Sequence, residues 1–292
     1  MAKTLKRKEL RFGLGMIGIY LGYTAIFWGY PFVWMLVLTF SKWNFVGKIR
    51  FVGFENFQRI FFDSTFWRIF MNTLNFLAFL IPMTLVTSLL YALALGKVRY
   101  LRSFVIFGFL VANVSSGVAY SIMFSNLFAS NGPVNRIVYA LFGTTIPWFS
   151  HPQLAVFSIC LMITWKFVGY YGLIIYAGLQ AIPQSVIEAA KIEGANNRTI
   201  FARIVLPLLN PSLVTVTILV TTLTFGIFTE PYMITGGGPM QKTLTPLIYM
   251  YDTAFRRINP SYATVVALVT ALISFGFVML IKRLFEKEVS FE

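Results

Sequence analysis

The sequence predicts an all-α fold, a polytopic membrane helix bundle with six transmembrane helices. Hydrophobic residues make up 58% of the 292 residues and charged residues only 12%, and the mean hydropathy is +0.75. A soluble domain carries about 25% charged residues. Six apolar stretches are each long enough to cross a bilayer, which takes about 20 helical residues. We therefore expect a single transmembrane domain over residues 1–292.

The six predicted spans are joined by short connections. They lie near residues 13–40, 69–95, 104–127, 153–178, 205–229 and 261–281. The first is too long for a cleaved signal peptide and has Pro31 and aromatic residues in its second half. The third, with Asn113, Ser115, Ser116 and Gly117, and the fifth, with many Thr residues, Pro207 and Pro211, have the weakest apolar character.

The distribution of Lys and Arg predicts the orientation of the spans. With the N-terminus inside, the inner segments hold fourteen basic residues and the outer segments nine. The inner ones are Lys3, Lys6, Arg7, Lys8, Arg11, Lys97, Arg99, Arg102, Lys191, Arg198, Arg203, Lys282, Arg283 and Lys287. Both termini and the 181–203 loop are therefore expected in the cytoplasm.

The net charge of +14 does not indicate nucleic-acid binding, because the basic residues flank apolar stretches instead of forming one patch. Cys160 is the only cysteine, so no disulfide within the chain is expected. His151 has no second histidine or cysteine cluster to complete a metal site, and we expect no bound metal.

Residues 185–207, named here the EAA segment, are the one extended polar stretch with local order of its own. Ser185 and Glu188 stand three residues apart, which is the spacing of a capping box. Ser185 is thus expected to cap a helix that runs through Ile192. Gly194 then supplies the left-handed residue that ends this helix.

A second short helix is expected in the EAA segment, capped by Asn196 or Asn197. Pro207 and Pro211 then kink the entry into the fifth span. Small side chains let another protein's backbone approach closely, and we expect them to share one face of the segment. These residues are Val186, Ala189, Ala190 and Ala195.

The EAA segment resembles the cytoplasmic coupling loop of ABC-importer permeases. That pattern reads Glu-Ala-Ala, three residues, Gly, nine residues, and then Ile-x-Leu-Pro; here it starts at Glu188 and ends at Pro207. The resemblance implies docking onto a separate ATPase subunit, with a basic residue of the ATPase facing Glu188. The implied ATPase-coupling residues are Glu188, Ala189, Ala190, Glu193, Gly194, Ala195, Ile204 and Pro207. Glu193 departs from the Asp that is common in the family.

Other motifs resemble carbohydrate-importer permeases of the maltose-permease and glycerol-phosphate-permease type. The likeness runs from about Phe51 to the last span. Its motifs lie at 51–57, 72–74, 131–135, 177–183 and 231–239. It implies import of a mono- or oligosaccharide, or of a sugar or glycerol phosphate derivative, by alternating access across a bacterial or archaeal cytoplasmic membrane.

The resemblance also implies the partners of the chain. They are a second homologous permease subunit, an ATPase subunit dimer that binds ATP and Mg²⁺, an extracytoplasmic solute-binding protein and the lipid bilayer. The chain itself has no Gly-rich phosphate loop ending in Gly-Lys-Ser/Thr and no catalytic pair of its own, so we expect no enzymatic activity and no bound cofactor.

Polar and aromatic side chains within the spans are candidates for the substrate path, because polar groups avoid lipid. They are Asn72, Asn113, Ser116, Tyr120, Tyr170, Thr222, Phe225 and Phe228. Such groups also hold membrane helices together, which is the alternative for each of them. Lys166 is the one clear charge inside a span. An anionic substrate is one partner for it, and the alternative is that Trp-Lys at this position is an ordinary feature of the family that the chain resembles. Glu230 is expected at the outer mouth.

A glycine-rich outer loop is the last candidate site. Gly236, Gly237, Gly238 and Pro239 leave the backbone open to close approach by a binding protein or the partner permease. A flexible hairpin turn is the alternative.

A secondary transporter or channel for a small polar solute is the alternative function. Proton or sodium coupling places acids within spans, whereas here the acids lie in loops or at span ends. A scaffold protein, or a lone helix–turn–helix without a partner, would leave the ordered EAA segment with nothing to cover it.

Overall fold

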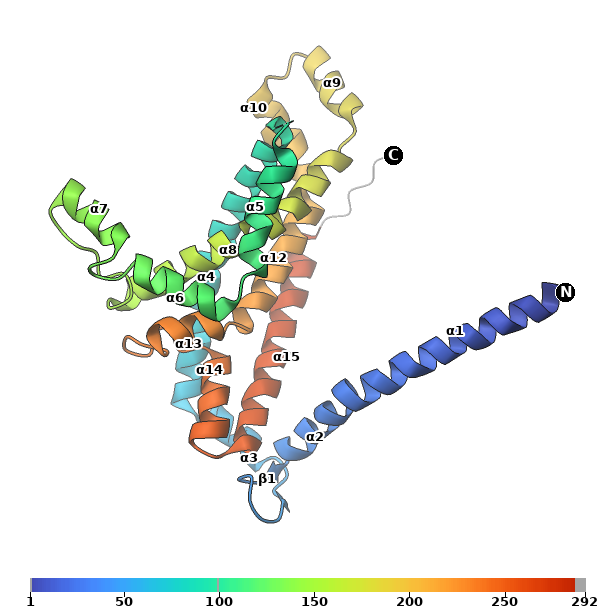
Figure 1. Ribbon diagram of the computed structural model, residues 1–292, viewed down its shortest axis with the longest axis vertical. Coiled ribbons are helices and arrows are strands. Elements are labelled where there is room, and N and C mark those ends of the chain that lie inside the picture. Colours follow the sequence, from blue (N-terminus) through green and yellow to red (C-terminus); the bar gives the residue numbers. More distant parts are fainter. Residues whose placement is uncertain (1, 99, 287–292) are drawn as a thin grey trace. The chain divides into compact units, whose positions relative to one another are not determined.

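The computed structural model describes residues 2–98 and 100–286, and side chains from residue 12 onward. Nearly all of its regular elements are helices, so the all-α fold is confirmed (Figure 1). Of the predicted inner basic residues, Arg99 and Lys287 lie outside the described residues. The same holds for the side chains of Lys3, Lys6, Arg7, Lys8 and Arg11.

The chain packs as two compact units. Unit 1 comprises Met1–Asp63 and Met250–Leu268, and unit 2 comprises Ser64–Tyr249 and Val269–Glu292. Helices α14 (Pro246–Tyr251) and α15 (Pro260–Phe285) contribute residues to both units. That residues 1–292 act as one permease domain stays a prediction.

Four helical segments are long and apolar enough to cross a membrane, and two bent helix pairs raise the number to six if each pair is one span. The four segments are Phe12–Thr39, Ser64–Lys97, Pro152–Ala181 and Pro260–Phe285. They correspond to the first, second, fourth and sixth predicted spans. The predicted third and fifth spans are the bent pairs.

Unit 1 is built around the end of the first candidate span. Its helical elements are α1 (Ala2–Thr24), η1 (Ala25–Gly29), α2 (Tyr30–Thr39), α3 (Glu55–Phe61), η3 (Asp252–Arg256) and the first part of α15. Strands β1 (Ser41–Lys42) and β2 (Arg50–Phe51) pair antiparallel, with Ser41 opposite Phe51. The Asn56 side chain donates hydrogen bonds to the carbonyl oxygens of Thr39 at 3.1 Å and Ser41 at 2.8 Å. The Thr39 carbonyl belongs to the last turn of α2, where helix carbonyls lack partners within the helix, and Ser41 follows in β1.

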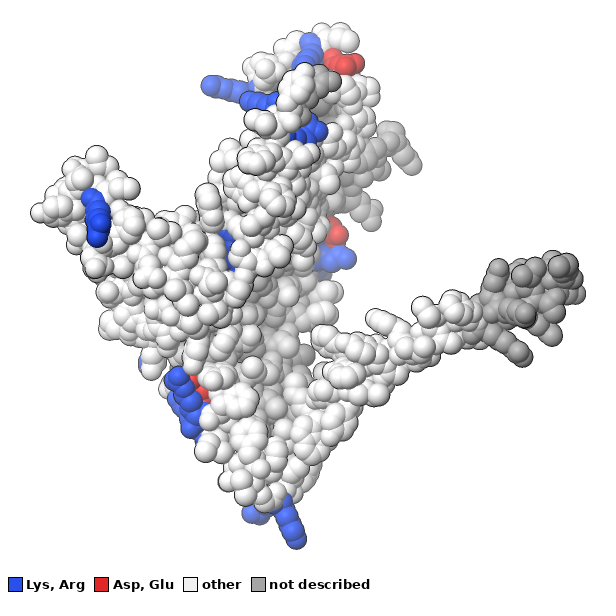
Figure 2. All heavy atoms as spheres, viewed as in Figure 1, with Lys and Arg blue, Asp and Glu red and all other residues white. Residues whose placement is uncertain are grey.

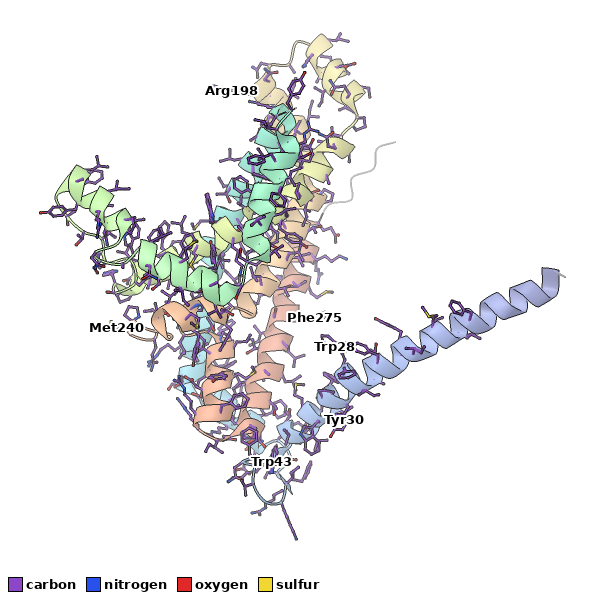
Figure 3. The ribbon with its side chains drawn as sticks, viewed as in Figure 1. Trp28, Tyr30, Trp43, Arg198, Met240 and Phe275 are labelled. Carbon is purple, nitrogen blue, oxygen red and sulfur yellow. The ribbon has the colours of Figure 1, made fainter. Side chains whose placement is uncertain are left out.

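A buried tyrosine closes unit 1. The Tyr262 hydroxyl donates to an Asp63 carboxylate oxygen at 2.6 Å, and the Arg59 guanidinium lies 4.3 Å from the centre of the Tyr262 ring. The apolar face of the first span, by contrast, is open. Trp28 and Tyr30 are 71% and 68% exposed (Figure 3).

Unit 2 is a helix bundle centred on the long helices α4 (Ser64–Lys97) and α8 (Pro152–Ala181). Helix α12 (Asn210–Phe225) packs against both, α5 (Arg102–Val114) packs on α8, and α13 (Thr229–Thr235) packs on α6 (Gly117–Leu127) and α8. The remaining elements are α7 (Pro133–Phe142), α9 (Gln184–Ile192), α10 (Asn197–Ile200), η2 (Phe201–Val205) and α11 (Leu206–Leu208).

Glycines on α8 allow close packing of its neighbours, as is common between membrane helices. A side-chain carbon at Gly169 would lie 2.7 Å from Cβ of Phe109 on α5. At Gly172 it would collide with the Tyr91 ring on α4, and at Gly178 with Ser212 on α12.

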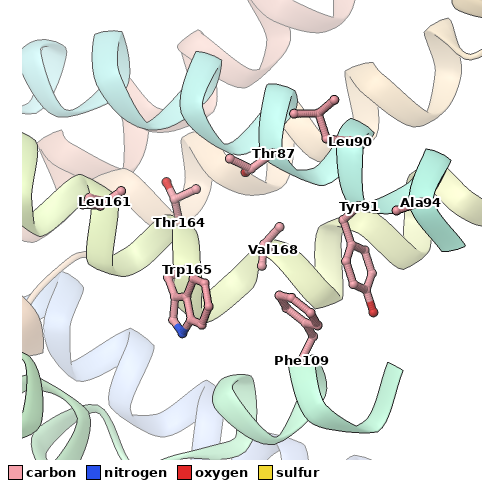
Figure 4. A pocket seen from close by; sticks show the side chains of 9 residues that line it. All are labelled: Thr87, Leu90, Tyr91, Ala94, Phe109, Leu161, Thr164, Trp165 and Val168. Carbon is pink, nitrogen blue, oxygen red and sulfur yellow. The ribbon is translucent and has the colours of Figure 1, made fainter. Parts of the chain in front are cut away.

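An apolar pocket of about 370 Å³ remains between α4, α5 and α8 (Figure 4). The rings of Phe109 and Trp165 line it, with their centroids 5.9 Å apart. Its lining is almost entirely hydrocarbon, so it offers shape and no polar recognition.

Candidate functional site

The EAA segment begins with helix α9. Its N-cap is Pro183, with φ −61° and ψ 131°, and no side chain caps the helix. The predicted capping box at Ser185 is therefore wrong, because Ser185 already lies in the first turn. The reason is Pro183 itself, which disfavours helical backbone at Ile182 and so ends α8 just before it.

The end of α9 is a Schellman motif. The backbone N–H of Gly194 donates to the carbonyl of Lys191 at 3.0 Å, and that of Ala195 donates to Ala190 at 2.9 Å. Gly194 has φ +84°, the left-handed conformation that favours glycine. The predicted left-handed stop is confirmed.

A side-chain cap starts the second helix, α10. The Asn196 side chain accepts a hydrogen bond from the backbone N–H of Thr199 at 2.9 Å, as one of the two alternatives predicted. Helix then continues through η2 and α11, and the pair Asn197–Leu208 and Asn210–Phe225 bends by 60°. Pro207 and Pro211 flank the bend and lack the N–H that an unbroken helix needs.

The inner face of the EAA segment packs into the core of unit 2. Ala190 and Ile200 are buried in one cluster with Ile159 of α8 and with Leu209, and Ala195 and Ile204 pack against this cluster. The expectation that Ala190 and Ala195 join an outward small-residue face is therefore wrong. They anchor the segment, because the Schellman motif brings these two positions together on the inner side.

The outer face of the EAA segment is open to solvent. Of the predicted coupling residues, Glu188, Ala189, Glu193, Gly194 and Pro207 are exposed. Charged side chains gather over this end of unit 2 (Figure 2), and Arg198 projects from α10 (Figure 3).

Ile192 also belongs to this outer face, and the sequence analysis does not include it. Its side chain is 87% exposed at the end of α9. A large aliphatic residue within a polar segment is the sequence feature that could have indicated Ile192 as a contact residue. The outer face of the EAA segment thus combines acids, small residues and exposed aliphatic side chains, of which Ile192 is the most exposed.

The predicted third span is a sharp elbow. Helices α5 and α6 meet at 100°, and Ser115 and Ser116 between them have extended backbone. The Ser115 hydroxyl donates to the Val111 carbonyl at 2.9 Å and so satisfies one carbonyl of the last turn of α5. A side-chain carbon at Gly117 would lie 3.1 Å from Thr229 Cγ2, so α6 approaches α13 closely at this point.

Lys166 and Glu230 form an ion pair beside the elbow. The Lys166 Nζ lies 3.3 Å from a Glu230 carboxylate oxygen, and the two side chains are only 9% and 11% exposed. The Lys166 Nζ also lies 5.5 Å from the centre of the Tyr120 ring. A side-chain carbon at Gly117 would be 3.5 Å from this nitrogen. We name Gly117, Tyr120, Lys166, Thr229 and Glu230 the elbow cluster.

The structure separates the predicted substrate-path residues into two groups. Asn72, Tyr120 and Phe225 are buried, whereas Asn113, Ser116, Tyr170, Thr222 and Phe228 are at least partly exposed. Tyr120 donates to the Met162 carbonyl at 2.6 Å, and Phe225 packs its ring 5.6 Å from Phe277. These groups hold helices together; whether any of the eight contacts a substrate stays a prediction.

The glycine-rich loop after α13 is anchored to α4. The Asn72 amide donates to the carbonyls of Gln241 at 2.6 Å and Leu244 at 3.2 Å. Gly237 is buried, and a side-chain carbon there would lie 2.9 Å from Leu244. The close backbone approach at Gly237 is thus made within this chain.

The rest of this loop is tied by hydroxyl groups. The Thr243 hydroxyl donates to the Gly238 carbonyl at 2.5 Å and lies 2.6 Å from the Thr235 hydroxyl. Gly236 and Met240 remain exposed, and Pro239 is half-buried (Figure 3). Contact of Gly236, Gly238 or Pro239 with another protein stays a prediction.

Residues 61–290 match the family of binding-protein-dependent transport system inner membrane components. The chain belongs to this family. The family is described as a transport component and not as an enzyme. Within the described residues, no three His, Cys, Asp or Glu side chains form a group that holds a metal ion.

Curated relatives of this permease include transport proteins named for carbohydrates. The lactose transport system permease protein LacF of Rhizobium radiobacter is 36% identical over 265 residues, covering 86% of this chain and 87% of LacF. The sulfoquinovosyl glycerol permease SmoG of Agrobacterium fabrum is 32% identical, covering 84% and 80%. The sn-glycerol-3-phosphate permease UgpA of Yersinia pestis is 30% identical, covering 93% of each chain.

A solved structure shares the fold of this permease. A chain of a bacterial ABC transporter that imports the acidic polysaccharide alginate has a TM-score of 0.80, with 19% identity and 96% coverage of both chains. A second structure of such a transporter, in complex with its pentasaccharide-bound periplasmic protein, also gives 0.80, with 18% identity and coverage of 98% and 99%.

The ion pair of the permease was within reach of sequence reasoning. Lys166 is the only charge inside a predicted span, and a buried charge requires a counter-charge. Glu230 directly follows the outer end of the fifth predicted span, so in sequence it is the acid closest to that end. The sequence alone places Glu230 at the outer mouth and Lys166 inside a span, and so it does not pair them. In the structure they form an ion pair beside the elbow.

Proposed function

We propose that this permease is one membrane subunit of an ATP-driven importer that moves a carbohydrate into the cytoplasm. The observation that carries the proposal is the EAA segment, whose two capped helices expose one face and embed the other in the bundle core. A coupling element must be stiff to transmit force. The Schellman motif at Gly194 and the Asn196 cap supply this stiffness.

The exposed face of the EAA segment is the proposed docking surface for an ATPase dimer. Glu188 and Glu193 offer charges to basic groups, and Ile192 offers an apolar anchor. Such a central apolar residue within a polar rim is typical of protein interfaces. ATP and Mg²⁺ bind to the ATPase, since this chain has no phosphate-binding loop.

The basic residues support an orientation with the EAA segment and both termini in the cytoplasm. In this orientation the glycine-rich loop after α13 faces outward, where a solute-binding protein delivers the cargo. The alginate transporter in complex with its periplasmic protein supports such a partner. A second, homologous permease subunit completes the path.

Carbohydrate as the cargo is supported by relatives named for lactose, sulfoquinovosyl glycerol and sn-glycerol-3-phosphate. The mechanism is alternating access. Closure of the ATPase dimer on ATP displaces the EAA segment, the permease opens outward and takes the solute, and hydrolysis returns it to release the solute inside.

Co-purification and ATPase assays test the proposal. The tagged permease should purify with an ATPase and a second permease. The ATPase activity of this complex in nanodiscs should require the binding protein with its sugar. Ile192→Asp serves as the interface variant, and Met240→Asp, 80% exposed against 87% but on the loop after α13, is the matched control for recovery of the ATPase. A permease that purifies alone and moves solute without ATP contradicts the proposal.

A further inference from the structure

The elbow cluster lies where two candidate spans lose their helical backbone. Helix α5 ends before Ser115, and α12 ends at Phe225, a few residues before Glu230 (Figure 1). Non-helical backbone at membrane depth is tolerated only where protein buries it or where it lines a water-filled cavity. In transporters, broken helices of this kind form the substrate site. The elbow cluster is therefore a candidate lining of the transport path.

The exposed groups beside the cluster are suited to an uncharged sugar. Ser116 and Tyr170 present hydroxyl groups, and Trp165 is 55% exposed beside Lys166 on α8. Tyr170 lies four residues after Lys166, on the same side of the helix. Hydroxyl groups pair with sugar hydroxyls, and exposed aromatic faces stack on sugar rings.

The charge at this place is balanced. Within the six apolar stretches predicted from the sequence, Lys166 is the only charged residue, and Glu230 neutralises it at 3.3 Å. A path for anions needs a cation without a competing acid. Here the cation is engaged and nearly buried, and the acid beside it repels a phosphate, sulfonate or carboxylate.

We propose that the Lys166–Glu230 pair sets the charge selectivity of the transport path, so that the cargo is an electrically neutral saccharide. This inference rests on the proposed carbohydrate import. It predicts an uncharged cargo, as in the name of the lactose relative, and not a phosphate ester, as in the name of the sn-glycerol-3-phosphate relative.

The pair acts through neutrality and not through either charge alone. Lys166→Gln leaves a nearly buried carboxylate, and Glu230→Gln leaves a nearly buried ammonium group. Breaking a buried ion pair by removing one partner reduces the population of the intact arrangement on the order of a hundredfold. The double variant, Lys166→Gln with Glu230→Gln, restores neutrality and retains hydrogen-bonding groups.

Transport by the reconstituted complex with its binding protein tests the proposal. The probes are neutral mono-, di- and trisaccharides, each paired with its phosphate ester and its uronate. Wild-type complex should move neutral members only. Each single variant should lose on the order of a hundredfold in transport rate. The double variant should recover most of that loss relative to either single variant, since an uncharged pair leaves no charge uncompensated.

A second measurement separates charge selectivity from mere folding. Without the binding protein, ligand-induced thermal stabilisation of the purified complex reports binding to the permease itself. The Glu230→Gln complex should gain stabilisation by the phosphate esters, because Lys166 is then free, and the double variant should not. Thermal unfolding without ligand identifies any variant that fails to fold, and the charge-exchanged variant, Lys166→Glu with Glu230→Lys, then replaces it.

The outcomes are distinguishable. If wild type moves phosphate esters or uronates, or if the double variant loses as much as Lys166→Gln, the neutral-cargo inference is overturned and carbohydrate import stands. If no member of the panel is moved, the proposed carbohydrate function itself is overturned.

Discussion

Replacing Gly194 tests whether the EAA segment works through its backbone geometry. Gly194 has φ +84°, and among the described residues a side-chain carbon there would meet no atom within 4 Å outside its two chain neighbours. The cost of a substitution within this chain is thus conformational. An ordinary residue in the left-handed region costs about 1–2 kcal/mol, and a β-branched one is a stronger outlier.

We expect transport activity to fall in the order wild type, Gly194→Asn, Gly194→Ala and Gly194→Val. Asn tolerates the left-handed conformation, Ala is strained by about 1–2 kcal/mol, and Val by more. A local cost of about 2 kcal/mol changes the equilibrium between the closed and the opened Schellman motif roughly thirtyfold in favour of the opened form. Two hydrogen bonds, from Gly194 to Lys191 and from Ala195 to Ala190, open with it.

Uptake and binding-protein-stimulated ATPase activity are the assays. Gly194→Val should abolish transport while membrane insertion and the unfolding temperature of the bundle change little, because the site touches nothing else. Normal uptake by Gly194→Val would refute the rigid-segment argument. Equal loss with Asn and Val would instead indicate that the absent side chain, and not the backbone, is what the partner requires.

Three further substitutions have expected outcomes. Asn72→Leu removes the two hydrogen bonds that the Asn72 amide donates to the loop after α13 and should lower the free energy of unfolding in detergent by about 1–3 kcal/mol. Gly169→Val overpacks the contact with Phe109 and should cost about 1–3 kcal/mol in the same measurement. Ile192→Asp should leave thermal unfolding unchanged, since the side chain is 87% exposed, but reduce ATPase recovery in pull-downs by at least about tenfold, the loss typical of a hot-spot residue.

The straight candidate spans were predictable because hydropathy marks the length of chain that avoids water. The bounds differ at the ends: α4 begins at Ser64, whereas the predicted span begins at residue 69. A helix continues past the apolar stretch as long as its backbone hydrogen bonds do. Hydropathy therefore locates the part of a helix that matches the apolar core of the membrane, and not the residue at which the helix ends.

The elbow of the third span was predictable as a weak point but not as a bend of 100°. Ser115 and Ser116 supply local alternatives to helical hydrogen bonding. The direction of α6, however, depends on Gly117 packing against Thr229, which is far away in the sequence. The same holds for Lys166 and Glu230: the residue types are visible locally, and their meeting is a tertiary event.

The direction of the alanines in the EAA segment shows a second limit of pattern reasoning. Ala190 and Ala195 suit a partner surface and a core equally well by size alone. What decides is the Schellman motif, which turns both toward the cluster around Ile200 and Leu209.

The inward direction of these alanines makes the EAA segment part of the bundle. Its core residues are continuous with those of α8, and its second helix runs through the bend at Leu209 into α12. The far end of α12 leads within five residues to Glu230, whose partner Lys166 lies on α8. Helix α12 belongs to the same core through Val216 and Val220, so a displacement of α9 and α10 relative to α8 would shear it. Cores resist such shear because they are close-packed, so the EAA segment passes a displacement on to α8 and α12 and does not move alone.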